Sequence, residues 1–176
     1  MTRDLPSASA LVQAVATRAR TAVEVTEDAL ACVAARNGEL NAIVTLNPRA
    51  LDDARAIDAR LAAGDTVGPL AGVPVGIKDI TPVAGLRTTY GSPIYADHVP
   101  DADAVVVERL RRAGAVIIGK TNTPEFAAGA NTWNTVFGAT RNPWNAALTS
   151  GGSTGGGARP IPSLAPVTSA TLPVIS

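Results

Sequence analysis

Histidine, cysteine and lysine are scarce in this chain. Its 176 residues include one histidine, His98, one cysteine, Cys32, and only two lysines against thirteen arginines. A single cysteine cannot form an internal disulfide, and one histidine with one distant cysteine is a poor zinc site. Cys32 lies in an apolar helical pattern, and His98 lies in a polar stretch that we expect to be an exposed loop. We therefore expect no metal, no cofactor and no catalysis through imidazole.

The chain also lacks an excess charge and a long hydrophobic run. Fifteen basic residues balance fifteen acidic ones, which leaves no electrostatic footprint for nucleic acid. No apolar run approaches the roughly 20 residues that cross a bilayer, and the N-terminus is a poor signal peptide. Together with the lone cysteine, these features favour a cytoplasmic protein that binds neither nucleic acid nor membrane.

Apolar periodicity predicts alternating helices and short strands. A hydrophobic content of 46% is enough for one domain with a core. Gly38 is expected to stop the second helix, and aspartates are expected near the positive end of the fourth. This alternation predicts an α/β domain with a covered sheet. The expected helices span 7–20, 21–40, 48–64 and 101–115, and the expected strands lie within 41–47, 68–80 and 115–122.

Both lysines follow apolar strands. Lys78 comes after "GVPVGI" and Lys120 after "AVIIG". Burial lowers the pKa of a lysine because desolvation disfavours its charged form, and a lysine of that kind can act as a general base. The alternative is that each lysine ends its strand and extends its ammonium group to water. Position alone leaves both interpretations open.

The stretch "GGSTGGG" begins at Gly151. It lacks the GK[ST] ending of a phosphate-binding P-loop, and its composition would suit a flexible linker. However, residues 134–150 before it are typical of ordered structure with packed aromatics. Glycines there would let the backbone approach a neighbour and would expose Ser153. Since the only histidine lies elsewhere, a neutral lysine is the candidate base for this serine.

Four motifs together resemble the amidase signature family over about residues 5–158. The motifs are "LAGVPVGIKD", "AGAVIIGKTNTPEF", "FGATRNPWN" and "GGSTGGG". The family hydrolyses carboxylic amides through a Ser–cis-Ser–Lys triad. The resemblance implies a partial amidase signature fold of the α/β class, in which N-terminal helices precede an incomplete mixed sheet covered by helices. It also implies a small-molecule amide as substrate.

The same resemblance assigns roles to individual residues. Lys78 would be the neutral base, and Ser153, held by a cis peptide bond, would relay a proton from a second, nucleophilic serine. Lys120 would be a structural residue beside the site. The segment around Ala127 would line the acyl pocket and contribute to substrate binding. Within the family, both a free-standing amidase and the glutaminase-like subunit of a transfer-RNA amidotransferase remain open; the segment around Trp133 favours the first.

The chain departs from the family after Ala158. The second glycine-rich motif, of the "GSDxGGSxR" kind, carries the nucleophilic serine in the family and is absent from these 176 residues. Residues 160–176 instead hold four prolines and no charge. We expect residues 1–158 to be the N-terminal part of an amidase domain and 159–176 to be a divergent, disordered tail. A truncated product read in a shifted frame would explain this pattern. Such a chain is expected to be inactive and marginally folded; the alternative is a non-catalytic amidase-like binding protein.

Overall fold

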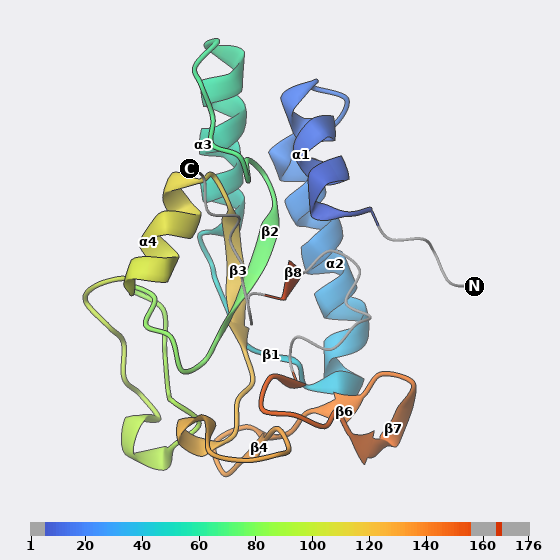
Figure 1. Ribbon diagram of the computed structural model, residues 1–176, viewed down its shortest axis with the longest axis vertical. Coiled ribbons are helices and arrows are strands. Elements are labelled where there is room, and N and C mark those ends of the chain that lie inside the picture. The colour runs from blue at the N-terminus through green and yellow to red at the C-terminus, as the bar shows by residue number, and fades with distance from the viewer. Residues whose placement is uncertain (1–5, 156–164, 167–176) are drawn as a thin grey trace, which may run out of the picture.

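Four α-helices and a small mixed sheet dominate the described part of the chain. The structure is a computed structural model that describes residues 6–155 and 165–166 (Figure 1). The α-helices are α1 (Ala8–Ala16), α2 (Ala22–Leu40), α3 (Ala50–Ala62) and α4 (Val105–Arg112), and the short 3₁₀ turns are η1 (Pro93–Tyr95) and η2 (Glu125–Ala127). The strands are β1 (Ile43–Leu46), β2 (Pro74–Lys78), β3 (Val116–Thr121), β4 (Trp133–Asn134), β5 (Gly138–Ala139), β6 (Arg141–Asn142), β7 (Asn145–Thr149) and β8 (Ala165–Pro166).

The main sheet has the strand order β1-β3-β2-β8. β1 runs antiparallel to β3, whereas β2 runs parallel to both β3 and β8. In Figure 1 the strands β2 and β3 run between α4 on one side and α1 with α2 on the other. The expected α/β class and mixed sheet are thus confirmed. Of the expected tail, residues 159–164 and 167–176 lie outside the described residues, and β8 pairs with Val75 and Gly76.

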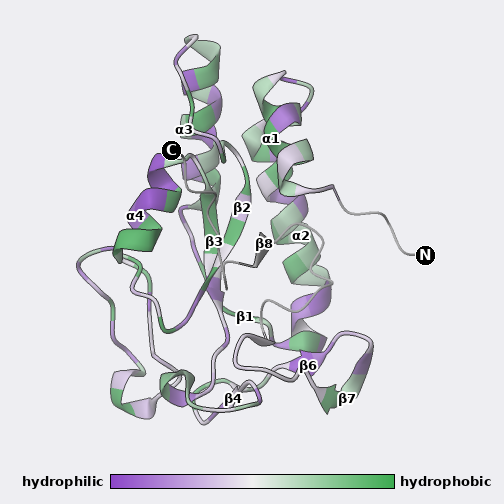
Figure 2. Ribbon diagram, in the orientation of Figure 1, coloured by the Kyte–Doolittle hydropathy of each residue, from purple (hydrophilic) through white to green (hydrophobic). Residues whose placement is uncertain are grey.

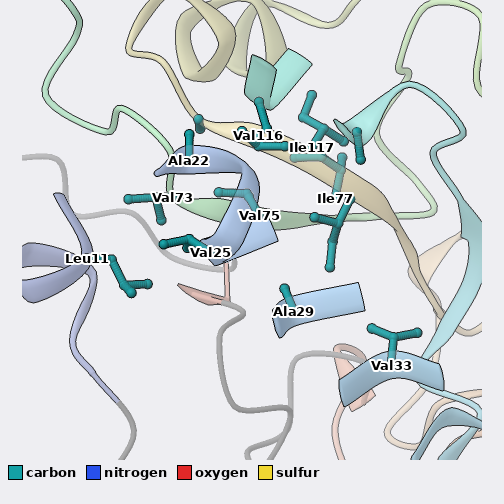
Figure 3. Packing of buried hydrophobic residues seen from close by; sticks show 14 of the residues in the cluster. Leu11, Ala22, Val25, Ala29, Val33, Val73, Val75, Ile77, Val116 and Ile117 are labelled. Carbon is teal, nitrogen blue, oxygen red and sulfur yellow. The ribbon is translucent and has the colours of Figure 1, made fainter. Parts of the chain in front are cut away.

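The core is formed where α2 packs against β2. Val25 and Ala29 of α2 lie beside Val75 and Ile77 of β2 (Figure 3), and all four side chains are almost fully buried. Burial of each of the three larger side chains, those of Val25, Val75 and Ile77, contributes about 1.5 to 3 kcal/mol to folding. Purple and green alternate along α2 and α3 in Figure 2, as expected for helices with one buried face.

α2 begins as the sequence suggests but ends later. Thr21 and Glu24 form a reciprocal capping box at its start. The predicted stop at Gly38 is wrong, because the helix continues to Leu40 and Asn41 adopts the left-handed conformation, with φ of 50°. The side-chain amide of Asn41 donates to the carbonyls of Phe137 and Ala139. These long-range contacts fix the end of the helix, which local sequence could not show.

α4 carries basic residues in its last turn, as expected for the helix dipole. The helix begins at Val105, and Asp103 lies two residues before it, near the positive end as expected. The carboxylate of Asp103 accepts from the amide of Ala84 at 2.7 Å and from the Arg111 guanidinium at 2.9 Å. Asp103 therefore ties a loop to the helix instead of capping the helix amides.

Candidate active site

Lys78 ends β2 at the edge of the buried sheet. The four strand residues before it are buried, and Lys78 itself is half-buried. In the parallel pairing with β3, Ile77 lies opposite Lys120 and Lys78 lies opposite Thr121. Because side chains alternate along a strand, the two lysines project to opposite faces of the sheet. Burial lowers the pKa of Lys78 from its ordinary value.

The glycine loop after β7 is held in place by Thr132. The buried Thr132 hydroxyl donates to the carbonyl of Gly152 at 2.9 Å and accepts from the amide of Gly155 at 2.6 Å. The amide of Gly152 also donates to the carbonyl of Ala130 at 2.6 Å. These contacts anchor the loop on both sides of Ser153. The linker interpretation is therefore wrong for residues 151–155.

Glycine is required at particular positions of this loop. Gly151 and Gly152 have φ of 67° and 73°, in the left-handed region that glycine enters without strain. At Gly155 the reason is space, since an added Cβ would collide with the hydroxyls of Ser150 and Thr132. The sequence signal was the glycine run itself, but nothing in the sequence pointed to Thr132 as its anchor.

Lys78, at the end of β2, contacts Ser153 in the glycine loop. The Nζ atom of Lys78 donates a hydrogen bond to the Oγ atom of Ser153 at 3.2 Å. The contact joins residues 75 positions apart in the chain, and it brings together the two residues that the sequence singled out. An amine of lowered pKa beside a hydroxyl has the components of a serine–lysine pair, in which the neutral amine accepts the hydroxyl proton.

The expected cis peptide bond at Ser153 is not present. All peptide bonds among residues 6–155 and 165–166 are trans. A cis bond before a residue other than proline costs about 3 to 4 kcal/mol and persists only where surrounding structure enforces it. The loop contacts of Thr132 and Ala130 are satisfied with trans bonds, and the Ser153 hydroxyl still reaches Lys78.

Lys120 lies in the protein interior on the other face of the sheet. Its side chain has no exposed area, so the interpretation in which it extends to water is wrong. Its Nζ atom donates to the Thr81 carbonyl and to the Thr88 hydroxyl, the latter at 2.7 Å, and lies 3.7 Å from a carboxylate oxygen of Asp79. Burial lowers the pKa of Lys120 to about 8, although Asp79 opposes that shift.

Asp79 completes this buried pair. Its second carboxylate oxygen accepts from the hydroxyl and the amide of Thr89, at 2.6 and 3.1 Å. Burial nevertheless raises the pKa of the Asp79 carboxyl above its usual value. The pair fixes the turn that follows Lys78, where Asp79 also bonds Thr121 and Tyr90 through its backbone. Sequence reasoning passed over Asp79, although it stands next to Lys78 in "GIKD".

The far end of the segment around Ala127 contacts the glycine loop. Phe126 and Ala127 both adopt left-handed backbone conformations, with φ of 49° and 58°. The Ala127 amide donates to the carbonyl of Pro124. Three residues later, Ala130 accepts the hydrogen bond from Gly152. The role of Ala127 in lining a substrate pocket stays a prediction.

Neither the single histidine nor the single cysteine is hydrogen-bonded to Lys78 or Ser153. His98 is exposed and stacks near Tyr90, with ring centroids 6.0 Å apart. Cys32 is half-buried against the core, and burial raises the pKa of its thiol. Among residues 6–155 and 165–166, no group of three histidine, cysteine, aspartate or glutamate side chains is arranged to hold a metal ion. Within the same part of the chain, the helices are too short or too polar to span a membrane.

The sequence of the chain matches a known protein family and several known relatives. The amidase family model matches residues 24–163. Over 152 residues the chain is 47% identical to a glutamyl-tRNA(Gln) amidotransferase subunit of Acidothermus cellulolyticus, and this match covers 86% of the chain and 30% of the relative. The chain therefore spans about a third of the length of the curated relatives that it matches.

Solved structures show the same fold. A bacterial aryl acylamidase of the amidase signature enzymes superposes with a TM-score of 0.82 at 31% identity, covering 86% of this chain and 32% of that one. The native peptide amidase of Stenotrophomonas maltophilia gives 0.80 at 33% identity, covering 85% and 32%. The described residues thus correspond to one part of a larger α/β fold, as the motifs indicated.

Proposed function

The chain belongs to the amidase signature family, and we propose that its Lys78–Ser153 pair is the base and proton relay of an amidase that hydrolyses small carboxylic amides. The observation that carries this proposal is the 3.2 Å hydrogen bond between the two side chains. Supporting it is the burial that lowers the pKa of Lys78 and so increases the fraction of neutral amine near neutral pH.

In the proposed reaction, Lys78 accepts the proton of Ser153. Ser153 accepts a proton from a second serine, whose oxygen then attacks the amide carbonyl carbon. The C–N bond breaks, and the departing ammonia or amine takes a proton back through the same relay. Water hydrolyses the resulting acyl ester and restores both hydroxyls. This proton relay uses side chains alone, so we propose no cofactor and no metal.

The second serine has no counterpart in the printed sequence with the expected glycine-rich surroundings. We therefore propose that the 176-residue chain by itself does not hydrolyse amides at an appreciable rate. Loss of one member of a catalytic triad commonly reduces the rate by about 10³-fold or more, since the members act as a unit. If no nucleophilic serine acts with this pair, the alternative function is that of a non-catalytic, amidase-like binding protein.

A glutaminase-like amidotransferase subunit is the second candidate. The 47% identity to the glutamyl-tRNA(Gln) amidotransferase relative favours it, whereas the fold similarity includes the aryl acylamidase and the peptide amidase. Both candidates use the same pair and differ in the acyl donor. Ammonia release from glutamine but not from aryl or peptide amides would select the amidotransferase type.

The test compares amide hydrolysis by two proteins. One is the chain as given, and the other is the product in which the reading frame is restored from Ala158. We expect ammonia or amine release only from the restored product, and we expect the Lys78→Arg variant to lose it, because arginine stays protonated. Full activity of the Lys78→Arg variant would refute the proposed base.

A further inference from the structure

We propose that Ser153 is itself a nucleophile in this chain, and that the Lys78–Ser153 pair becomes acylated by activated carboxylic esters. This activity goes beyond the proposed amidase, in which Ser153 only relays a proton. It concerns the 176-residue chain as it stands and needs no second serine. The substrate class is an ester with a good leaving group, such as an aryl acetate.

The first support is the isolation of the pair. Ser153 is the only described hydroxyl group to which the Nζ atom of Lys78 is hydrogen-bonded. Its oxygen therefore has a base within reach, and within the described residues the Lys78 amine has no competing hydroxyl partner. Serine–lysine pairs of this kind are an established variant of nucleophilic catalysis.

The second support is access. Gly151 and Gly152, which precede Ser153, are exposed, and Ser153 is half-buried. With no side chain at either glycine, an acyl group can approach the Ser153 oxygen from the solvent side of the loop. The anchoring by Thr132 keeps the hydroxyl at a defined position during that approach.

The third support is a pair of backbone amides in the same loop. Those of Ser153 and Thr154 donate to no acceptor within the described part of the chain. The amide of the residue after a nucleophilic serine is a common oxyanion donor in serine hydrolases. Because neither amide has an acceptor among residues 6–155 and 165–166, we place the oxyanion that develops on the ester carbonyl beside them.

The chemical step balances without a further reactant. Neutral Lys78 takes the Ser153 proton as the serine oxygen attacks the ester carbon. The tetrahedral intermediate collapses, the C–O bond to the leaving group breaks, and the phenolate departs, while Lys78 passes the proton it had taken to the phenolate or to solvent and becomes neutral again. Acyl-Ser153 remains. Water then attacks this ester while Lys78 accepts a proton, which releases the carboxylate and restores the serine.

The experiment uses p-nitrophenyl acetate and the full 176-residue chain. We expect a burst of nitrophenolate that approaches one equivalent per chain, and peptide mass spectrometry that locates the acetyl group on Ser153. Ser153→Ala should abolish the burst. Lys78→Arg should slow acetylation by about 100-fold or more, the contribution typical of a general base. Thr149→Val, which removes an exposed hydroxyl on β7, is the matched control and should react like the natural chain.

Three results would overturn the inference. The first is an acetyl group on Lys78, on the N-terminal amine or on another hydroxyl while Ser153 stays unmodified. The second is a burst of undiminished size in Ser153→Ala, when Ser153→Ala and Lys78→Arg both show the circular dichroism of the natural chain. The third is the absence of a burst in the natural chain. Each result concerns ester cleavage by the 176-residue chain, so the amidase proposal is judged separately by amide hydrolysis in the restored product.

Discussion

At the scale of single residues, the two lysines show how similar local sequences lead to different environments. Each follows an apolar strand, yet β2 and β3 present them on opposite faces of the sheet. Lys78 meets a serine from a distant loop, whereas Lys120 is enclosed with Asp79. The scarcity of lysine singled out both residues, and only strand register separated the candidate base from the structural cation.

Removing Lys120 should destabilise the fold strongly. The Lys120→Met substitution leaves the Asp79 carboxylate buried without its cation, and such losses typically amount to about 3 to 5 kcal/mol. The double variant Asp79→Asn/Lys120→Met removes both charges and should be less destabilised than the single variant. Urea unfolding of the three proteins measures these differences. Equal losses in the single and double variants would contradict a charge-based cause.

Titration of Lys120 should make the free energy of unfolding depend on pH. Its pKa is about 8 in the folded chain and returns to its ordinary value of 10.5 on unfolding. Between these values the unfolded chain holds more protons than the folded one, so the free energy of unfolding rises with pH. We expect the natural chain to gain stability relative to Asp79→Asn/Lys120→Met from about pH 8 to 10.5. A constant difference over that window would refute the shifted pKa.

At the scale of elements, the glycine loop depends on one side chain from a distant segment. Thr132 bonds the loop on both sides of Ser153. Thr132→Val keeps the shape and removes both hydrogen bonds, so the hydrogen-bonded amides of Gly152 and Gly155 should exchange with solvent at least several-fold faster. Hydrogen exchange followed by mass spectrometry measures this change. Unaltered exchange in the loop would show that Thr132 is not its anchor.

The glycine inside α2 gives a second test at this scale. Gly38 lies within the helix, and an added Cβ there would meet nothing within 4 Å. Gly38→Ala should therefore stabilise the chain by about 0.5 to 1 kcal/mol. Gly64 is the matched contrast, since its φ of 81° makes Gly64→Ala destabilising despite equally open space. Thermal unfolding that shows destabilisation by both variants would contradict the helix boundary at Asn41.

At the scale of the whole molecule, local sequence patterns predicted the helices and strands better than they predicted which side chains pack together. The four expected helices are present within their expected ranges, and both apolar stretches that precede the lysines are strands. The packed aromatics expected in residues 134–150 are only partly confirmed, because 77% of Trp144 is exposed. Phe137 is half-buried below the guanidinium of Arg87, at 5.2 Å.

The candidate site was accessible to sequence reasoning only in part. Lysine scarcity and the glycine run pointed to Lys78 and Ser153, because both features are local. Thr132, Asp79 and their contacts depend on which segments lie side by side, and no periodicity encodes that information. The same applies to the end of α2, which is fixed by contacts of Asn41 with residues almost a hundred positions away.

The central claim is that Lys78 is a base of lowered pKa that is bonded to Ser153. Because the chain has only two lysines, labelling lysine with ¹³C at Cε gives two resonances, and Lys78→Arg removes one and so assigns both. Titration of the Lys78 resonance by NMR is the most direct measurement. We predict a pKa below the ordinary value of 10.5 and a change in that pKa in Ser153→Ala. An ordinary pKa that is the same in both proteins would contradict the account.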